Sequence, residues 1–475
     1  MGLSVPASRK HRLPIREHLS LCVPAQFGIG TRWSCSGGLV LTRRMHLPHL
    51  SFLPTFFSVR GRVSSSVPPP AQPIHSSRTP HIVIGITNPQ TCLVLGSHLR
   101  TLREAGFRVT LVSSPGELLT GTAAREGVES IAIPMRREMA LAADILSLVR
   151  LWWLLYRLKP EMTEFSTPKA GLLGSIAAML CGVPVRVYFL RGLKLETSTG
   201  LKRRILLLAE QVASACSHAV LCNSDSLRSR ALALGVASEA KLRLLGCGSS
   251  GGVDVERFSP GTSDQRSRLG LPPDAHVVGF VGRLTRDKGL PELIEAFETI
   301  LAVKPEAHLL LVGWFDASED GLELDLRSRI KKHPRIHSTG FVADTAPYYR
   351  AMDVMVLPTW REGFPNVVLE AAATGIPVVT TLSTGSRDAV VPEVTGLLIP
   401  PGYPVAIHEA VLHLLRNPER RCRMGKAARA WVLDHYAHSQ VLNRTVLYYK
   451  SLLELNLSRI SRTEPVSSGS ALNPV

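Results

Sequence analysis

The chain has 475 residues, of which 45% are hydrophobic and 20% charged, and its formal net charge is +17. This length is too great for one hydrophobic core, so we expect at least two domains of a soluble globular protein. The charge suggests an anionic partner, yet residues 1–78 hold ten Lys and Arg against a single acid, so it is weak evidence that the folded part binds nucleic acid.

The eight cysteines form no CxxC pair and stand beside no histidine cluster. This spacing argues against a zinc site and against a disulfide framework. A reducing, cytoplasmic compartment is therefore expected.

Residues 1–79 are rich in Pro, Ser and Arg and show no sustained periodicity. We interpret them as a disordered leader or as the result of a wrongly assigned start codon, with a transit peptide as the alternative. The segment is left out of the fold prediction.

From residue 81 onward, short β-branched runs alternate with helical patterns, which predicts a parallel sheet covered by helices on both faces. The expected strands are 81–87, 108–114, 127–134, 161–167 (a weak one), 185–190 and 218–224. The expected helices are 97–107, 139–158, 170–182, 201–215 and 226–235.

A second round of the same pattern follows the Gly/Ser-rich stretch 246–254. Its expected strands are 277–284, 307–314, 335–341, 353–359, 376–381 and 396–401. Its expected helices are 291–303, 346–352, one within 362–375, 404–416, 418–435 and 438–455. Two Rossmann-like, doubly wound α/β domains would leave a cleft between them, and ligands of such sheets bind at the carboxyl ends of strands.

The motif GRLTRDKG follows the first strand of the second half and carries Arg283 and Lys288. Two cations at the carboxyl end of a strand suit a diphosphate, because Arg can fork onto phosphate oxygens and Lys supplies a point charge. Most such spacings are only solvated loops, so this motif needs support from another strand end.

That support comes from EGFPNVVLE, which follows the strand 353–359. Pro365 suits a first helical turn, and the free N–H groups of Asn366, Val367 and Val368 would form an anion site there. Glu362 in the loop and Glu370 inside the helix would face the cleft from different depths. Either acid alone could be a bland surface or helix-start carboxylate, but opposite a basic loop they suit a nucleotide-sugar.

The motifs GRLTRDKG, LLLVG, TGFV and above all EGFPNVVLEAAATGIPVV resemble the carboxyl-terminal half of the family 4 glycosyltransferases. These are retaining, metal-independent enzymes of the GT-B fold. The resemblance covers roughly residues 80–455 and is strongest at 277–402. The stretches 166–174, 191–204 and 386–402 are most similar to bacterial enzymes that extend lipid-linked glycans for surface polysaccharide.

The resemblance implies a domain plan and a role for each matching position. It implies an acceptor domain at 80–258, a nucleotide-sugar domain at 259–430, a helix at 431–458 that returns to the first domain, and a disordered tail at 459–475. Arg283 and Lys288 would stabilise the leaving nucleoside diphosphate, Glu370 would bind the ribose and Glu362 would lie near the donor sugar. The backbone of Gly363, Phe364, Pro365, Asn366, Val367 and Val368 would cradle sugar and phosphate, and the turn Gly340, Phe341 and Val342 would border the base.

The implied reaction is transfer with retention, in which positive charge at the diphosphate does most of the work. The sequence holds no Asp-x-Asp, which agrees with side-chain cations in place of a metal. We expect no cofactor, a UDP-sugar as the donor and a polyprenyl-diphosphate-linked or polysaccharide acceptor.

One departure from the family pattern lies after the strand 185–190, where many relatives carry His-Gly and this chain carries Arg191-Gly192. Arg191 cannot act as a base, but it could bind a phosphate or a carboxylate of the acceptor. Lys169 is a candidate for the acceptor phosphate or merely a cation at a helix start.

Basic and large apolar residues mix at 150–158 and 201–208. These segments could form ordinary packed helices or a membrane-facing edge, and a lipid acceptor favours weak peripheral contact at the inner face of the plasma membrane.

Two alternative functions remain open: a nucleotide-sugar epimerase or hydrolase of the same fold, and a basic nucleic-acid-binding protein. The first loop, 87–91, lacks GxGxxG, which disfavours an NAD-binding domain.

Overall fold

The structure is a computed structural model that describes residues 79–136, 140–316 and 320–463. All of these belong to one compact unit of the chain, Ile74–Val475. Of the predicted leader 1–79 and the predicted disordered tail 459–475, residues 1–78 and 464–475 lie outside the described residues, whereas residues 459–463 continue the last helix of the chain.

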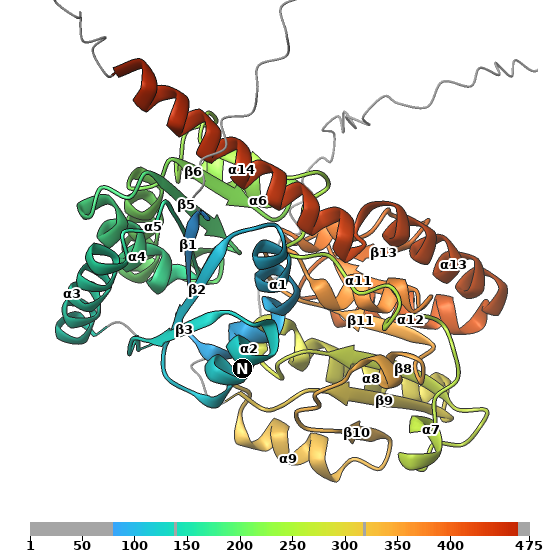
Figure 1. Ribbon diagram of the computed structural model, residues 1–475. Helices are drawn as coiled ribbons and strands as arrows, with labels where there is room; N and C mark the ends of the chain where they lie inside the picture. Colours follow the sequence, from blue (N-terminus) through green and yellow to red (C-terminus); the bar gives the residue numbers. More distant parts are fainter. Residues whose placement is uncertain (1–78, 137–139, 317–319, 464–475) are drawn as a thin grey trace, which may run out of the picture. The chain divides into compact units, whose positions relative to one another are not determined.

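The first half is built on a seven-stranded parallel sheet with the strand order β3-β2-β1-β4-β5-β6-β7 (Figure 1). Central strands are apolar on both faces because helices cover both, as in Ile82, Val83 and Ile84 of β1, which are fully buried. The strands are β1 His81–Gly85, β2 Arg108–Ser113, β3 Glu129–Ala132, β4 Met162–Ser166, β5 Val185–Leu190, β6 Ala219–Cys222 and β7 Leu242–Leu244.

The helices of this half lie on either side of the sheet. Residues of α3 and α4 pack on one face, and residues of α1 and the C-terminal helix α14 pack on the other. The helices are α1 Gly96–Glu104, α2 Glu117–Glu126, α3 Leu141–Leu158, α4 Pro168–Leu180, α5 Gly200–Ala215 and α6 Asp225–Ala233, with the 3-10 helices η1 Pro89–Val94 and η2 Lys194–Thr197.

The second half repeats the plan with six parallel strands in the order β10-β9-β8-β11-β12-β13. The strands are β8 His276–Val281, β9 Ala307–Val312, β10 Ile336–Ser338, β11 Val354–Leu357, β12 Val378–Thr381 and β13 Gly396–Ile399. The helices are α7 Gln265–Arg268, η3 Arg286–Lys288, α8 Leu290–Val303, α9 Leu324–Lys332, α10 Ala346–Tyr349, α11 Asn366–Ala373, η4 Ser386–Ala389, α12 Pro404–Arg416, α13 Pro418–His435 and α14 His438–Thr463.

These two parallel-sheet domains confirm the predicted fold class. The strand β7, the helices α2, α7 and α9, and the four 3-10 helices were not predicted from the sequence. Each is short, and α9 has one fully buried residue, Ile330, so its apolar periodicity is weak. Among the described residues, no helix has the length and apolarity needed to cross a bilayer.

The C-terminal helix α14 belongs to the core of the first sheet. Val446 and Tyr449 are buried there, and the Tyr449 hydroxyl donates a hydrogen bond to Glu164 Oε2 at 2.7 Å. Because Glu164 lies on the central strand β4, helix α14 completes the hydrophobic core of the first sheet.

A buried carboxyl group in the first half gives a pH-dependent prediction. Glu210 of α5 accepts a hydrogen bond from Tyr188 at 2.5 Å, and burial raises the pKa of Glu210 to about 7. The folded state therefore holds this proton more tightly than the unfolded state, and its stability falls as the pH rises from about 4.5 to 7.

We expect Glu210→Gln to be more stable than the wild type at pH 8, by up to about 3 kcal/mol, and to lose that advantage at pH 5. Melting temperatures of both proteins at the two pH values check this. The exposed Glu239→Gln serves as the control with no such difference. The prediction would be wrong if the difference in melting temperature between Glu210→Gln and the wild type were the same at pH 5 and pH 8.

Candidate active site

The loops that follow β8 and β9 meet at the carboxyl edge of the second sheet. The Leu284 N–H donates to the Trp314 carbonyl at 2.9 Å. Gly289 closes the β8 loop with a φ of 74°, and a Cβ there would lie 2.0 Å from the Pro358 carbonyl oxygen. Only glycine fits this turn, which fixes the direction in which Lys288 leaves the backbone.

The loop after β11 lies against the loops of its two neighbours. The Trp360 N–H donates to the Asp287 carbonyl at 2.9 Å, and the Glu362 N–H donates to the Thr384 carbonyl, beyond β12, at 3.0 Å. The strand order therefore brings the loops after β8, β11 and β12 to one edge, although they are far apart in sequence.

The central contact of this edge is an ion pair between Lys288 Nζ and Glu362 Oε1. The two side chains are 17% and 15% exposed, so the pair is partly shielded but open to a ligand. The two motifs that the sequence predicts to face each other are thus in direct contact.

Asp287 holds this arrangement in place, although the sequence analysis did not single it out. Its buried carboxylate accepts hydrogen bonds from Thr285 Oγ1 at 2.6 Å and from Arg361 at 3.0 Å. Burial alone would raise the pKa of Asp287, but the charges of Lys288 and Arg361 outweigh it and hold the pKa below its usual value. The carboxylate therefore stays ionised and anchors the backbone around Lys288.

The Arg283 side chain does not point toward Glu362 as that of Lys288 does, although the sequence predicts that the two cations bind phosphate together. Its guanidinium pairs with Asp316, just beyond β9, at 2.6 Å and remains a quarter exposed. It still contributes to the field that lowers the pKa of Asp287. The structure thus brings Lys288 together with Glu362, whereas Arg283, from the same loop as Lys288, turns its side chain toward the loop after β9.

The start of α11 differs in detail from the prediction. Pro365 is the N-cap residue rather than part of the first turn, and the helix begins at Asn366. The Val368 N–H donates to the Pro365 carbonyl at 3.0 Å, so the expectation that it is a free donor is wrong. The anion site predicted at this helix start is therefore reduced to the N–H groups of Asn366 and Val367.

Glu370 lies one turn inside α11 and accepts a hydrogen bond from the Tyr349 hydroxyl at 2.8 Å. Burial raises the pKa of Glu370 above its usual value. Tyr349, fully buried in α10, also donates to the Val367 carbonyl at 3.2 Å. No pattern in the sequence indicated this tyrosine, which orients the carboxylate.

The TGFV turn lies beside the end of β9, where Gly340 pairs with Gly313 in an isolated bridge. Phe341 is 55% exposed and contacts the Trp314 ring edge-on at a centroid distance of 5.6 Å. Val342 packs against the domain core. An exposed aromatic ring next to a glycine turn suits contact with a flat base.

The backbone of Arg191, in the first half, lies against the backbone of Gly363 at the same edge. A Cβ at Gly363 would lie 2.0 Å from the Arg191 carbonyl oxygen, so only glycine allows this approach. The Arg191 guanidinium stacks on the Phe189 ring at 4.2 Å and lies 3.6 Å from the fully buried Glu164. Arg191 is thus held rigidly beside the Glu362–Gly363 segment.

Further polar contacts join the loops of the two sheets. Arg361 Nε donates to Thr197 Oγ1 at 2.8 Å, and Thr384 Oγ1 donates to Glu196 at the same distance. The Ser226 N–H donates to Asp388 at 3.0 Å. None of these residues was predicted, because each contact depends on side chains from sequence-distant loops.

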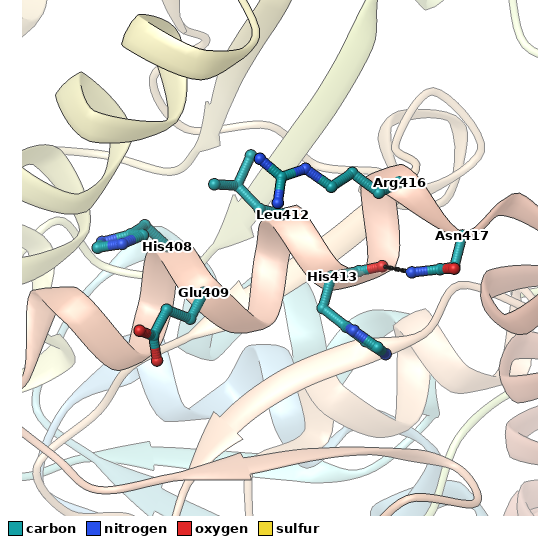
Figure 2. A pocket seen from close by; sticks show the side chains of 6 residues that line it. All are labelled: His408, Glu409, Leu412, His413, Arg416 and Asn417. Carbon is teal, nitrogen blue, oxygen red and sulfur yellow. Dashed lines mark hydrogen bonds between the residues drawn. The ribbon is translucent and has the colours of Figure 1, made fainter.

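Two other features lie apart from this edge. Lys169 forms an ion pair with Asp144 of α3 at 2.7 Å. A hollow along α12 is lined by His408, Glu409, Leu412, His413, Arg416 and Asn417, and Asn417 donates to the His413 carbonyl at 2.7 Å (Figure 2). None of the predicted site residues lines this hollow.

Two family models match the chain and together span both halves. One, described as "Glycosyl transferases group 1", matches residues 275–417, and the other, "Glycosyl transferase 4-like domain", matches residues 94–248.

Two relatives of known role are similar along the sequence. The capsular polysaccharide biosynthesis glycosyltransferase CapM of Staphylococcus aureus is 33% identical over 372 residues, which is 78% of this chain and 96% of that protein. The UDP-Gal:alpha-D-GlcNAc-diphosphoundecaprenol alpha-1,3-galactosyltransferase of Escherichia coli is 28% identical over 284 residues, 58% of this chain and 71% of that protein.

Solved structures share the fold at lower identity. Anabaena Alr3699/HepE, solved in complex with UDP, superposes with a TM-score of 0.65 at 17% identity and covers 78% of this chain and all of its own. Sucrose-phosphate synthase from Thermosynechococcus elongatus gives a TM-score of 0.67 at 22% identity, covering 79% of this chain and all of its own. These likenesses confirm the predicted GT-B architecture.

Proposed function

The chain belongs to the family 4 glycosyltransferases, and from this premise we propose that it moves a hexose or N-acetylhexosamine from a nucleotide-sugar to a lipid-linked or polysaccharide acceptor, with retention of configuration. The observation that carries the proposal is the contact of Lys288 with Glu362, in the loop that leads into α11. It places a cation, a carboxylate and a helix N-terminus at one strand edge, which is what a sugar diphosphate requires.

Each part of the donor has a group suited to it. Lys288, with Arg283 of the same loop, binds the diphosphate, and Glu370 accepts hydrogen bonds from the ribose. The turn from Gly340 to Val342 borders the base, and the Gly363–Val368 backbone cradles the sugar. A UDP-sugar as donor is supported by the UDP and UDP-glucose complexes of Anabaena Alr3699/HepE; no cofactor is required.

The acceptor is proposed from the relatives. CapM acts in capsular polysaccharide biosynthesis and the E. coli enzyme on a sugar-diphosphoundecaprenol, by their names. A polyprenyl-diphosphate-linked glycan at the inner face of the plasma membrane fits both, with the protein in the cytoplasm and in weak peripheral contact with the bilayer. Nucleic acid is no partner in this proposal.

In the proposed reaction the C1–O bond to the diphosphate breaks first, and the sugar becomes oxocarbenium-like. Lys288 stabilises the negative charge that develops on the leaving diphosphate. The acceptor hydroxyl then attacks C1 from the same face and passes its proton to the departing diphosphate oxygen as the new C1–O bond forms. Glu362 fixes the ammonium group of Lys288 at this position before the donor arrives.

The test is a donor screen with UDP- and GDP-sugars, with and without an undecaprenyl-diphosphate-linked N-acetylglucosamine. We expect nucleoside diphosphate release and a new glycoside only when the acceptor is present, and NMR of the product to show the anomeric configuration of the donor. Isomerised donor or free sugar without acceptor would instead support the epimerase or hydrolase alternative, and an inverted product would overturn the retaining mechanism.

A binding prediction addresses the ribose site directly. We expect Glu370→Ala to weaken UDP binding by about 10- to 100-fold, because it removes charge-assisted hydrogen bonds. Isothermal titration of UDP measures this, with the exposed Glu409→Ala of α12 as the matched control. Unchanged UDP affinity in Glu370→Ala would refute the ribose assignment.

A further inference from the structure

Helix α3 exposes an apolar stripe along its whole length. The stripe repeats with helical spacing, so it forms one face of the helix. Trp153 is 53% exposed and Tyr156 is 59% exposed. Its members are Leu141, Ile145, Leu146, Val149, Trp152, Trp153 and Tyr156.

The neighbouring helices extend this stripe into a surface. Helix α4 packs between α3 and α5 (Figure 1), and Cys181 Sγ at its end donates to the Trp152 carbonyl at 3.2 Å. The end of α4 adds Met179 and Leu180, and α5 adds Leu201, Ile205 and Leu208. These three helices carry 12 of the 28 large hydrophobic side chains that are exposed among the described residues, a concentration that marks an interaction surface. We call it the α3–α5 face.

The charges that border the face have one sign. Arg150, Arg157 and Arg204 are exposed, and the Arg157 guanidinium lies 4.4 Å from the centre of the Trp153 ring. The acids of these three helices are neutralised or hidden, since Asp144 pairs with Lys169 and Glu210 is buried. The face therefore combines aromatic and aliphatic side chains with cations alone.

We propose that the α3–α5 face docks onto a lipid bilayer that carries anionic headgroups, with α3 lying in the plane of the interface. Indole and phenol rings favour the headgroup level, and arginines attract anionic lipids. With 18 residues, α3 is about 27 Å long, and its charges exclude it as a membrane span. The inference deepens the proposed function, because a surface-bound enzyme meets a lipid-linked acceptor in two dimensions.

The experiment is flotation of the full-length protein with vesicles of phosphatidylcholine alone or with added phosphatidylglycerol, at low and at high salt. We expect wild-type protein to float with the anionic vesicles and to be released by salt. The variant Trp153→Ser/Tyr156→Ser should partition at least about tenfold less, and Arg150→Glu/Arg157→Glu should lose the preference for phosphatidylglycerol.

The matched control is Tyr403→Ser/Val405→Ser, which removes two equally exposed side chains from the start of α12 and should float as wild type. Because all substituted side chains are exposed, melting temperatures should be unchanged. Wild type that stays in solution, or aromatic variants that float undiminished, would overturn the proposal. So would a wild-type dimer that the aromatic substitutions dissociate, since the face would then bind a second copy.

Transfer to a water-soluble acceptor analogue separates this inference from the proposed function. Variants of the α3–α5 face should retain that activity while they lose vesicle binding. Absence of transfer by wild-type protein that still floats would count against the function and leave the docking face intact.

Discussion

Lys288→Ala should lower the rate of sugar transfer by about 10²- to 10³-fold, the loss seen when one group that stabilises developing negative charge is removed. The ammonium group lies at the carboxyl edge of the second sheet, where Glu362 holds it. In the proposed reaction the leaving diphosphate would then lack the cation that stabilises it, and Glu362 loses its partner. Initial rates of nucleoside diphosphate release at saturating donor measure the effect.

Arg286→Ala is the matched control for that experiment. Arg286 belongs to the same 3-10 helix, η3, but its side chain is about half exposed and pairs with Glu323 at 2.8 Å. We expect its substitution to change the rate by less than about threefold, since exposed ion pairs contribute little. Equal losses in both variants would show that general positive charge, and not the position of Lys288, supports the reaction.

Glu164→Leu should lower the melting temperature by roughly 10 °C, because removing one partner from a buried charge network costs about 3–5 kcal/mol. Glu164 is fully buried and accepts hydrogen bonds from His98 at 3.0 Å and from Tyr449 at 2.7 Å, with Arg191 at 3.6 Å. Although burial favours its neutral form, the charges of His98 and Arg191 hold the pKa of Glu164 below its usual value. The substitution leaves these partners buried without a counter-charge.

Glu129→Leu provides the comparison for the stability measurement. Glu129 also pairs with an arginine, Arg108 at 2.8 Å, but both side chains are about half exposed. Its loss should cost no more than about 1 kcal/mol. Similar melting temperatures for the Glu164 and Glu129 variants would contradict the view that the buried network stabilises the first half.

Apart from β7, the strands and their order of appearance could be predicted because their signal is local. The runs at β1, β8 and β9 are apolar, β-branched or leucine-rich, and almost fully buried. That the loops of Lys288 and Glu362, 74 residues apart, lie at one edge also followed from sequence, since parallel strands end at one edge. Only the positions of loops were needed for it, not the rotamers of side chains.

The remaining features depend on partners that sequence patterns do not reveal. The segment 161–167 looked like a weak strand because Glu164 interrupts it, yet β4 is the central strand of its sheet. Its carboxylate is tolerated there only because α1 and α14 bring His98 and Tyr449 to it. The turn of Arg283 toward Asp316, and the bond of Arg361 to Asp287, likewise depend on side-chain geometry in separate loops.

The position of Tyr449 has a consequence for biosynthesis. A ribosome delivers the first sheet early, but the Tyr449 hydroxyl group and the aliphatic side chains of α14 that complete its core are synthesised only after the whole second sheet. Until then the nascent amino-terminal half exposes the apolar surface that α14 will cover, and Glu164 lacks the hydrogen bond from Tyr449. Its maturation must therefore be completed after translation of the carboxyl-terminal half, and premature termination before α14 should yield a chain that chaperones or proteases recognise.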